Sequence, residues 1–466
     1  MMKLGQALQW VDAATLVGDA STTVTRVHTD TRSLLPGDLF VALKGDNFDA
    51  HDFLAQAKMQ GCVAAIAQHG LDAAGLPGLL VTDSKLALGQ LAKKWRAQFD
   101  LPLIAVTGSN GKTTVTQMIA SILRACKADR AFATEGNLNN DIGVPLTLLR
   151  LSAHHKIAVV ELGMNHPGEI AYLADIARPT VALVNNAQRE HLEFMGTVEA
   201  VAHENGSVID ALDMRGVAVF PADDEYTAVW RKAAGARAQL TFALSGQADV
   251  TATAHWDANC WQVAASTPGG AFEFKLHVAG RHNVKNALAA TACALAAGVP
   301  AHDIAAGLTA FEPVKGRSRA VQVSFQNRTV SLIDDTYNSN PDSMHAAIDV
   351  LAALPGPRLL VMGDMGEVGD AGPRFHAEAG QWAKAQGIEN LYTLGEQSVG
   401  ASASFDVGLH FNDVDTLKAA VLAQLPHVGS VLVKGSRFMK MERVVQAITA
   451  HQLAENKKHK ETPHAA

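Results

Sequence analysis

The stretch VTGSNGKTT, residues 106–114, constrains the fold of this chain more than any other segment. Its glycines Gly108 and Gly111 permit a tight path of the backbone, and Lys112 follows the second glycine directly. A short apolar run precedes the stretch, and apolar residues recur at helical spacing from 115 to 123 behind it. A loop that joins a strand to a helix in this way presents free backbone N–H groups and the helix dipole to an anion. The stretch therefore predicts a phosphate-binding loop, although the common pattern G-x-x-x-x-G-K-[ST] has a glycine where Val106 stands.

Short apolar runs alternate with helical patterns along most of the sequence, which is typical of parallel sheets covered by helices on both faces. In the middle of the chain the expected strands are 103–106, 157–162, 181–184 and 217–220. A second series has strands at 330–333, 359–362, 391–394 and 431–433, with helices at 342–353 and 437–448. Nearer the start, strands at 39–43 and 63–67 flank a helix at 51–60.

This alternation predicts an α/β protein of three domains, since 466 residues exceed what one hydrophobic core usually serves. We expect a small mixed α/β domain at 1–84, a central parallel-sheet domain with the phosphate loop at 85–314 and a C-terminal Rossmann-like α/β domain at 315–455. The second joint coincides with PVKGRSR, which carries proline, glycine and charge without periodicity. Residues 456–466 are polar and charged, and we expect a flexible tail there.

Composition narrows the class of protein further. Apolar residues make up 48% and charged residues 18% of the chain, a balance that favours globular domains over disorder. Acidic residues outnumber basic ones by 46 to 39, so we expect no nucleic-acid partner. The sequence shows neither an apolar leader segment nor a run of about eighteen apolar residues. We therefore expect a cytoplasmic protein without membrane insertion, and nothing in the sequence points beyond a monomer.

Taken whole, TGSNGKTT resembles the T-G-x-x-G-K-[ST]-[ST] loop of the Mur ligase family. Seven further stretches resemble segments of this family in the same order along the chain: GNLNNDIGVPLT, VVELGMNHPGEI, ALVNNAQREHLEFMG, GRHNVKNALAA, DDTYNSNPDSM, VMGDMGEVG and VLVKGSRFMKMERVV. With TDTRSLLPGDLFVALKG at 29–45, the resemblance covers nearly the whole chain. It implies a ligase that uses ATP and Mg2+. The branch that this chain resembles joins D-alanyl-D-alanine to UDP-N-acetylmuramoyl-tripeptide in the synthesis of peptidoglycan precursors.

The chemistry of such a ligase explains the residue types in the loop region. Joining a carboxylate to an amine in water is uphill, so ATP first converts the carboxylate to an acyl phosphate, which the amine then attacks. Both steps gather negative charge on phosphate oxygens, and Mg2+ and fixed cations stabilise it. The resemblance implies that the loop binds ATP through Thr107, Gly108, Ser109, Asn110, Gly111, Lys112, Thr113 and Thr114.

The resemblance also assigns Thr113, Glu161 and His191 to magnesium, and Lys112, Glu161 and His191 to catalysis. On the residues alone, a glutamate at a strand end is more often solvated, and a lone histidine is more often packed. Glu161 and His191 nevertheless follow successive expected strands beside the loop, at the sheet edge where ligands collect.

Further ligand contacts are implied outside the loop. The resemblance assigns Asn283, Asn286, Arg317, Asp335, Asn338 and Asn340 to ATP. Spacing by three places Asn283 and Asn286 on one helix face, although Asn283 alone also suits a helix cap. Asn340, before a proline, equally suits a turn and a helix start.

The implied substrate residues fall into three groups: Thr31, Arg32, Lys44, Asn47, Asp49 and His51 for the uridine end, Asn137, Asn139 and Asn140 for the peptide, and Lys434, Ser436 and Arg437 for the acyl phosphate or the dipeptide. Several members of the first group are turn formers that need no ligand. A substrate divided among three domains implies that they close before chemistry, so we expect an open form without ligands and a compact form with them.

One position departs from the family pattern. Many relatives place a lysine fourteen residues after the histidine that corresponds to His191, and CO2 converts it to a carbamate that bridges the magnesium site. Here that position is Asn205, which has no amine. The hypothesis is that the amide oxygen of Asn205 takes part instead, while Glu161 and His191 carry more of the metal binding. The alternative is that Asn205 is only a helix surface residue. The neighbouring Glu204 cannot replace it, because successive helical side chains diverge by about 100°.

Other functions share the loop. A Mur ligase that adds a single amino acid has it too, but the diaminopimelate-adding relative usually carries Asp-Asn-Pro-Arg in its third domain, and this tetrapeptide is absent here. Folylpolyglutamate ligase shares the loop but lacks DDTYNSNPDSM and the first domain. A nucleotide-dependent binding module without catalysis would require Glu161 and His191 to be packing residues.

Overall fold

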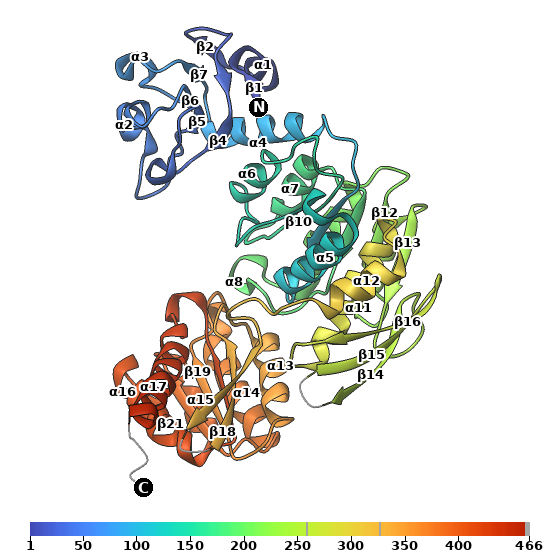
Figure 1. The fold of residues 1–466 in the computed structure, drawn as a ribbon, viewed down its shortest axis with the longest axis vertical. Coiled ribbons are helices and arrows are strands. Elements are labelled where there is room, and N and C mark those ends of the chain that lie inside the picture. The colour runs from blue at the N-terminus through green and yellow to red at the C-terminus, as the bar shows by residue number, and fades with distance from the viewer. Residues whose placement is uncertain (258–259, 326–327, 462–466) are drawn as a thin grey trace.

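The computed structural model describes residues 1–257, 260–325 and 328–461. Figure 1 shows three α/β units in succession along the long axis, with the first at one end and the third at the other. We call residues 1–83 the first unit, 84–309 the central unit and 316–461 the third unit. Each is built on a mainly parallel sheet, so the expected fold class is confirmed. Among the residues described, no helix is long and apolar enough to cross a membrane.

The first unit contains a five-stranded sheet in the order β2-β7-β6-β5-β4, in which only β2 runs antiparallel. Its strands are β2 (Thr15–Val17), β4 (Arg26–His28), β5 (Asp38–Val41), β6 (Ala64–Ala67) and β7 (Gly78–Leu80), beside a separate pair, β1 (Met2–Lys3) and β3 (Thr23–Val24). The helices are α1 (Leu4–Trp10), α2 (Leu54–Met59) and α3 (Leu71–Ala74). The two strands expected here are confirmed, while the expected helix at 51–60 begins as the 3-10 turn Ala50–Phe53 and continues as α2.

The central unit is built on a six-stranded, wholly parallel sheet in the order β13-β12-β11-β8-β10-β9. Its strands are β8 (Leu103–Thr107), β9 (Ala131–Ala133), β10 (Ile157–Glu161), β11 (Val181–Val184), β12 (Val217–Pro221) and β13 (Ala238–Phe242), which confirms the four that were expected. Side chains of β8 alternate between two cores, with Leu103 and Ala105 on one face and Ile104 and Val106 on the other. Because the sheet is buried on both faces, its strands appear in the sequence as continuous apolar runs.

Helices cover both faces of the central sheet. One face carries α5 (Lys112–Lys127), α11 (Arg281–Ala296) and α12 (Ala301–Thr309). The other carries α6 (Gly143–Leu148), α7 (Glu169–Ala177), α9 (Val198–Asp210) and α10 (Thr227–Ala234), with the short α8 (Leu192–Met195) before α9. The core of this second face continues into the first unit through α4 (Ser84–Arg96), so these two units share one core.

An antiparallel three-stranded sheet in the central unit was not expected from the sequence. It consists of β14 (Thr251–Asp257), β15 (Cys260–Thr267) and β16 (Gly270–Leu276). Only one face is buried: Val263 and Ala265 of β15 and Phe274 and Leu276 of β16 join the core beneath α11 and α12. Because only alternate residues are buried, these strands contain no continuous apolar run. The criterion that identifies strands buried on both faces therefore does not detect this sheet.

The third unit has a six-stranded sheet in the order β17-β18-β22-β19-β20-β21, antiparallel only between β17 and β18. Its elements are β17 (Arg319–Phe325), β18 (Arg328–Asp335), α13 (Pro341–Ala352), β19 (Arg358–Gly363), α14 (Gly372–Ala385), β20 (Asn390–Leu394), α15 (Val399–Phe405), β21 (Leu409–Phe411), α16 (Val414–Gln424), β22 (Ser430–Lys434) and α17 (Glu442–Glu461). The four expected strands and the helix at 342–353 are confirmed.

The last helix differs from expectation at both ends. It begins at Glu442 rather than 437, because Arg437–Met439 forms a 3-10 turn and Lys440 adopts a left-handed φ of 51°. It continues through Glu461, into the segment expected to be a tail. Residues 462–466 of that segment lie outside the described part of the chain.

We expect Gly307→Ala to destabilise the central unit, because α12 crosses the loop helix α5 at this glycine. A Cβ atom at Gly307 would lie 2.3 Å from the Cα atom of Ile122. Overpacking of this kind costs about 1–3 kcal/mol of unfolding free energy. Gly400→Ala in α15 is the matched control, because its Cβ atom would meet nothing closer than 3.6 Å and alanine favours a helix by up to about 1 kcal/mol. Denaturant midpoints measure both variants, and equal midpoints would contradict the close crossing.

Candidate active site

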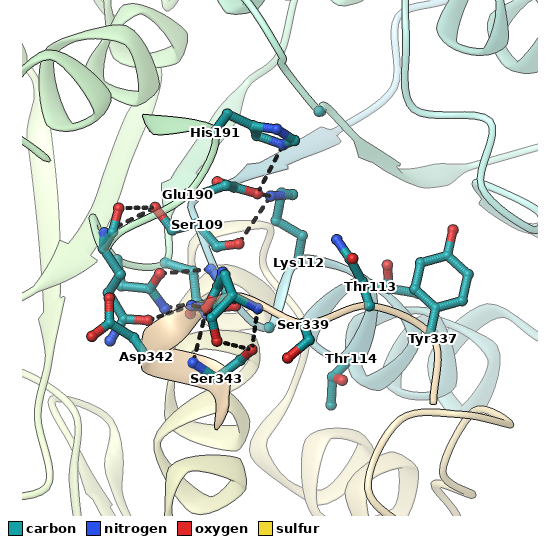
Figure 2. A pocket seen from close by; sticks show the side chains of 18 of the residues that line it. Ser109, Lys112, Thr113, Thr114, Glu190, His191, Tyr337, Ser339, Asp342 and Ser343 are labelled. Carbon is teal, nitrogen blue, oxygen red and sulfur yellow. Dashed lines mark hydrogen bonds and ion pairs between the residues drawn. The ribbon is translucent and has the colours of Figure 1, made fainter. Parts of the chain in front are cut away.

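A cavity of about 1280 Å³ lies between the central and third units. Figure 2 shows side chains of α5, such as Lys112 and Thr113, beside Tyr337 and Ser339 of the third unit. The structure brings most of the predicted residues together around it: Ser109, Asn110, Gly111, Lys112, Thr113, Thr114, Asn137, Asn139, Asn140, Glu161, His191, Asn283, Asn286, Arg317, Asp335, Asn338, Asn340, Lys434, Ser436 and Arg437. Residues far apart in the sequence therefore line one cavity.

The phosphate loop owes its path to two glycines. Gly108 has φ of +132°, and Gly111, the N-cap of α5, has φ of +82°. A Cβ atom at Gly111 would also lie 2.7 Å from Oδ1 of Asn286. The backbone N–H of Asn110 donates to Oδ1 of Asn186 at 2.8 Å, which holds the loop against the segment after β11. Val106 lies inside β8, fully buried, so the loop begins later than in the common pattern and needs no glycine there.

Glu161 lies beside the loop because β10 pairs with β8 in a register that sets it opposite Val106. Its carboxylate is 2% exposed, and its Oε1 accepts hydrogen bonds from Oγ1 of Thr113 at 3.0 Å and from Nδ2 of Asn139 at 2.8 Å. A hydroxyl and a carboxylate therefore meet at the start of the loop helix. Both are hard oxygen donors of the kind that Mg2+ prefers.

His191 is placed by a sharp turn, since it adopts a left-handed φ of 49° as the N-cap of α8. Its Nδ1 lies 2.8 Å from Oε2 of Glu367 in the third unit, and its Nε2 lies 3.6 Å from Oε1 of Glu190. The close contact with His191 lowers the pKa of Glu367. The third expected magnesium residue thus contacts carboxylates from both sides of the cavity.

A chain of amides connects the loop to α11. Nδ2 of Asn185 donates to Oδ1 of Asn286 at 3.0 Å, and Nδ2 of Asn286 donates to Oδ1 of Asn283 at 3.0 Å. Asn283 and Asn286 therefore share one helix face, as their spacing predicts. The alternative that Asn283 caps the helix is wrong, because α11 begins at Arg281 after the cap residue Gly280.

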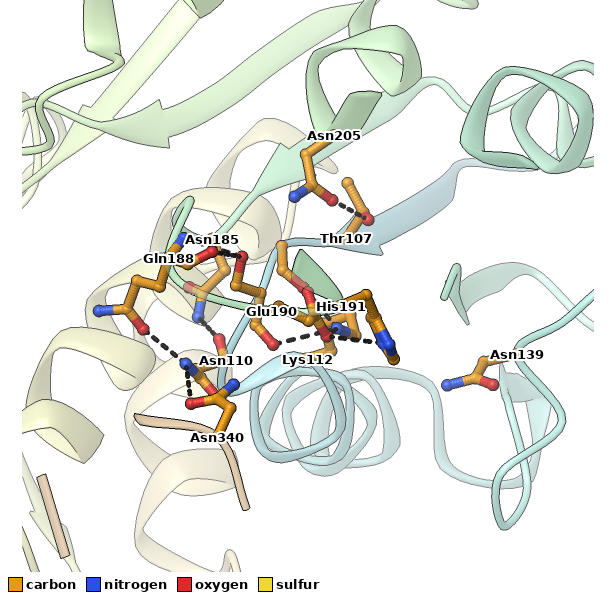
Figure 3. Close-up of polar contacts among 12 residues, drawn as sticks. Thr107, Asn110, Lys112, Asn139, Asn185, Gln188, Glu190, His191, Asn205 and Asn340 are labelled. Atoms are coloured by element: carbon orange, nitrogen blue, oxygen red, sulfur yellow. Dashed lines mark hydrogen bonds and ion pairs between the residues drawn. The ribbon is translucent and has the colours of Figure 1, made fainter. Parts of the chain in front are cut away.

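The helix-start interpretation of Asn340 is confirmed, and its contact with ATP stays a prediction. It is the N-cap of α13, where its Oδ1 accepts a hydrogen bond from the backbone N–H of Ser343 at 2.8 Å. It also exchanges two amide hydrogen bonds with Asn110 of the loop, at 3.0 and 3.3 Å, as Figure 3 shows for one of them. A helix start in the third unit is thereby tied to the phosphate loop.

Lys434 ends β22 as a buried cation. Its ammonium donates to Oδ2 of Asp335 at 2.6 Å and to the carbonyl oxygen of Asn338 at 2.9 Å. Burial alone would raise the pKa of Asp335, but the attraction and hydrogen bond of Lys434 outweigh it and hold the pKa below its ordinary value. The guanidinium groups of Arg317 and Arg437 lie 4.1 and 5.8 Å from the ring centre of Tyr337. This wall of the cavity is rich in fixed cations.

The segment 188–191 makes contacts across the cavity that were not predicted from the sequence, apart from the presence of His191 in the site. Oε1 of Gln188 accepts from Nδ2 of Asn110 at 2.6 Å. The guanidinium of Arg189 binds Asp342 at 2.7 Å and Glu378 at 3.0 Å, both in the third unit. The carboxylate of Glu190 lies 2.5 Å from the ammonium of Lys112. These contacts could have been anticipated from the run of polar residues that directly follows a strand buried on both faces.

The residues assigned to the uridine end lie elsewhere. They belong to the first unit: Thr31, Arg32, Lys44, Asn47, Asp49 and His51. None of them lines the cavity, because the described residues that do so begin at Ser109. Asp49 caps the 3-10 turn Ala50–Phe53, and its Oδ1 lies 2.6 Å from Nδ1 of His51. Arg32 is exposed and binds the neighbouring Asp30 at 2.7 Å. These bonds accord with the turn-former alternative for Asp49.

Asn205 is wholly buried, so the alternative that it is a helix surface residue is wrong. Its Oδ1 accepts a hydrogen bond from Oγ1 of Thr107 at 2.7 Å (Figure 3). The amide oxygen is therefore already engaged at the end of β8. Glu204 points elsewhere, as expected, because its carboxylate accepts the backbone N–H groups of Gly168 and Ile170 at 2.9 and 2.8 Å.

Two family models match the chain: the Mur ligase middle domain over residues 106–294, and the Mur ligase, glutamate ligase domain over 316–437. A UDP-N-acetylmuramoyl-tripeptide--D-alanyl-D-alanine ligase of Escherichia coli (strain K12) is 43% identical over 92% of this chain and 94% of its own. Among solved structures, MurF from Acinetobacter baumannii gives a TM-score of 0.87 at 37% identity, over 96% of this chain and 98% of that one. MurF ligase from Thermotoga maritima in complex with ADP gives 0.80 at 27% identity, over 93% and 99%.

We expect Lys434→Met to lower the free energy of unfolding by about 3 kcal/mol, because it leaves the Asp335 carboxylate, which is 14% exposed, without its cation. Adding Asp335→Asn should recover much of this loss in stability, since the second substitution removes the uncompensated negative charge. Denaturant unfolding of the two single variants and the double variant measures the coupling.

The pH dependence of stability is a second measurement on the same variants. Because the pKa of Asp335 is lowered, the contribution of the pair should be complete at neutral pH and be lost as the pH falls below the ordinary carboxyl pKa of 3.8. The double variant should lose less stability over that range. Additive effects of the two substitutions would contradict the ion pair.

Proposed function

The chain belongs to the Mur ligase family, and on that premise we propose that it is an ATP-dependent ligase that joins D-alanyl-D-alanine to UDP-N-acetylmuramoyl-tripeptide. The observation that carries the proposal is 43% identity to the Escherichia coli ligase of that name over 92% of the chain. The products are the pentapeptide precursor of peptidoglycan, ADP and phosphate. We infer that the enzyme works in the cytoplasm as a monomer.

The three domains divide this task. We infer that residues 1–84 bind the UDP end of the acceptor, that 85–314 bind ATP, and that 315–455 complete the site. The first group of substrate residues, from Thr31 to His51, serves the uridine end in this assignment. The neutral amides of Asn137, Asn139 and Asn140 suit the peptide portion. The amides of Asn283 and Asn286 suit the adenine, whose ring edge carries both donors and acceptors.

Phosphorylation of the acceptor carboxylate depends on the loop. The ammonium of Lys112 and the N–H groups at the start of α5 stabilise the charge that develops on the transferred phosphoryl group. Thr113 and Glu161 have oxygens 3.0 Å apart, and this hard donor set fits Mg2+. We assign these two residues with His191 to the ion. Bound there, Mg2+ shields the negative charge of the phosphates.

Attack by the amine of the dipeptide depends on the cations of the third unit. Two N–H groups of Lys434 are bound to Asp335 and Asn338, and the third can donate to an oxygen of the acyl phosphate. Arg317 and Arg437 beside Tyr337 add positive charge on the same wall of the cavity. These groups stabilise the tetrahedral intermediate and the departing phosphate.

The proposal predicts that phosphate is released from ATP only when the UDP-linked tripeptide and D-alanyl-D-alanine are both present, because acyl phosphate formation and its capture by the amine form one sequence. A phosphate-release assay with each substrate omitted in turn measures this. Replacing the dipeptide by diaminopimelate tests the single-amino-acid ligase, and supplying a folate with glutamate tests the folylpolyglutamate ligase. Efficient turnover with either replacement would reject the proposal.

Lys112→Ala should abolish turnover because it removes the cation on the phosphate side, and the protein should remain folded, although the side chain is only 14% exposed and its loss leaves Glu190 without a counter-ion. We expect kcat to fall by about 100-fold or more. Lys156→Ala, which removes an exposed lysine, is the matched control and should keep normal activity. Steady-state kinetics with circular dichroism as the check of folding measure both variants. Near-normal kcat in Lys112→Ala would exclude the phosphate-loop assignment.

A further inference from the structure

Glu190 is a buried carboxylate that the reaction described above does not use. It lies between β11 and α8, is 8% exposed and lines the cavity. Its Oε1 lies 2.5 Å from Nζ of Lys112, as Figure 3 shows, whereas its Oε2 is buried without a hydrogen-bond partner in the described part of the chain. A buried carboxylate oxygen without a partner is costly, so this atom requires an explanation.

The ammonium of Lys112 is fully occupied. It donates to the carbonyl oxygens of Gly108 and Ser109, at 2.6 and 3.1 Å, and to Glu190 at 2.5 Å. An ammonium has only three N–H groups, so one partner must give way before Lys112 can reach a phosphate. The two carbonyls belong to the backbone of the loop itself. Glu190 is the only partner that is a side chain and an anion, so it is the one that the phosphate replaces.

Glu190 cannot follow Lys112 or leave the cavity by a movement of its backbone. Arg189 on one side is bound to Asp342 and Glu378, and His191 on the other side contacts Glu367. Once Lys112 turns to the phosphate, the carboxylate therefore stays near a second anion. Two buried anions repel each other strongly unless a cation lies between them.

We propose that Glu190 is an additional carboxylate ligand of the divalent cation that accompanies the nucleotide, and that Lys112 holds this ligand ready until phosphate takes the ammonium. The proposal rests on the proposed function, which supplies the nucleotide and the cation. Glu190 lines the same cavity as Glu161 and Thr113, and its buried, unpartnered Oε2 is a hard oxygen donor that becomes available when the side chain is released from Lys112. The exchange leaves neither the ammonium nor the carboxylate without a counter-charge.

The cation site is completed only with the nucleotide. Among the described His, Cys, Asp and Glu side chains, the only three with ligand atoms already within 4.8 Å of one another are Asp49, His51 and His69 in the first unit. That group is not an open metal site, because Nδ1 of His51 contacts Asp49 and its Nε2 accepts the backbone N–H of Gln68 at 2.9 Å. Glu190 thus becomes a cation ligand only in the nucleotide complex, so its contribution to cation affinity should appear only when nucleotide and cation bind together.

The test is calorimetric titration of the full chain with ADP, in EDTA and in MgCl2. In EDTA, Glu190→Gln should bind ADP more tightly than the unmodified protein, because a repelling charge is removed and Lys112 is released. The factor by which MgCl2 raises the affinity for ADP should be at least about 10-fold smaller in Glu190→Gln than in the unmodified protein. A loss of this size is typical even of residues that only support a metal ligand. Titration of the ADP complex with Mn2+, followed by electron paramagnetic resonance, should show the same loss of cation affinity.

Two further variants serve as controls. Glu193→Gln removes an exposed carboxylate from the neighbouring helix α8 and should follow the unmodified protein in both buffers. Glu190→Asp keeps the carboxylate on a shorter side chain and should retain part of the Mg2+ effect. Thermal midpoints establish that each variant is folded.

The outcomes are distinct. If Glu190→Gln weakens ADP binding equally in both buffers, Glu190 only positions Lys112 and the proposal is overturned. Unchanged affinities in both buffers, or full Mg2+ and Mn2+ affinity in the variant, also overturn it. If the unmodified protein itself fails to bind ADP, the proposed function is rejected, and this proposal, which rests on it, is rejected too.

Discussion

Parallel pairing of β8 with both β10 and β11 is the constraint on which the site depends. The register sets Glu161 opposite Val106 and Val184 opposite Thr107, so three neighbouring strands end at the same level. The phosphate loop, the Glu161 carboxylate and the polar segment after β11 consequently leave the sheet at one edge. A shift of the pairing by one residue would exchange the two faces of a strand and bring Glu161 into an apolar core.

Most of this framework could be predicted from the sequence, because local patterns encode it. Strands buried on both faces appear as apolar runs, and the loop appears as two glycines between a strand and a helix. The sheet β14–β16 was missed because only alternate residues are buried. The cavity wall was predictable only through the family resemblance. Asn110 and Asn340 exchange hydrogen bonds across 230 positions, and no local pattern records a partner so far away.

The polar groups of the site largely satisfy one another within the protein. Lys112 has three acceptors, Asn286 bonds to both Asn185 and Asn283, and Lys434 is neutralised by Asp335. A nucleotide that enters must exchange these bonds rather than simply add new ones. Its affinity therefore reflects a difference between two sets of hydrogen bonds and charges, which is smaller than either set alone.

The segment 188–191 joins the two halves of the site through alternate residues. Gln188 and Glu190 bind the phosphate loop, at Asn110 and Lys112 respectively. Arg189 and His191 bind the third unit, through the carboxylates described above. Glu190, the side-chain partner of Lys112, therefore lies between two residues that bind the other wall of the cavity. The phosphate loop and the third unit therefore contact the same four consecutive residues of the chain.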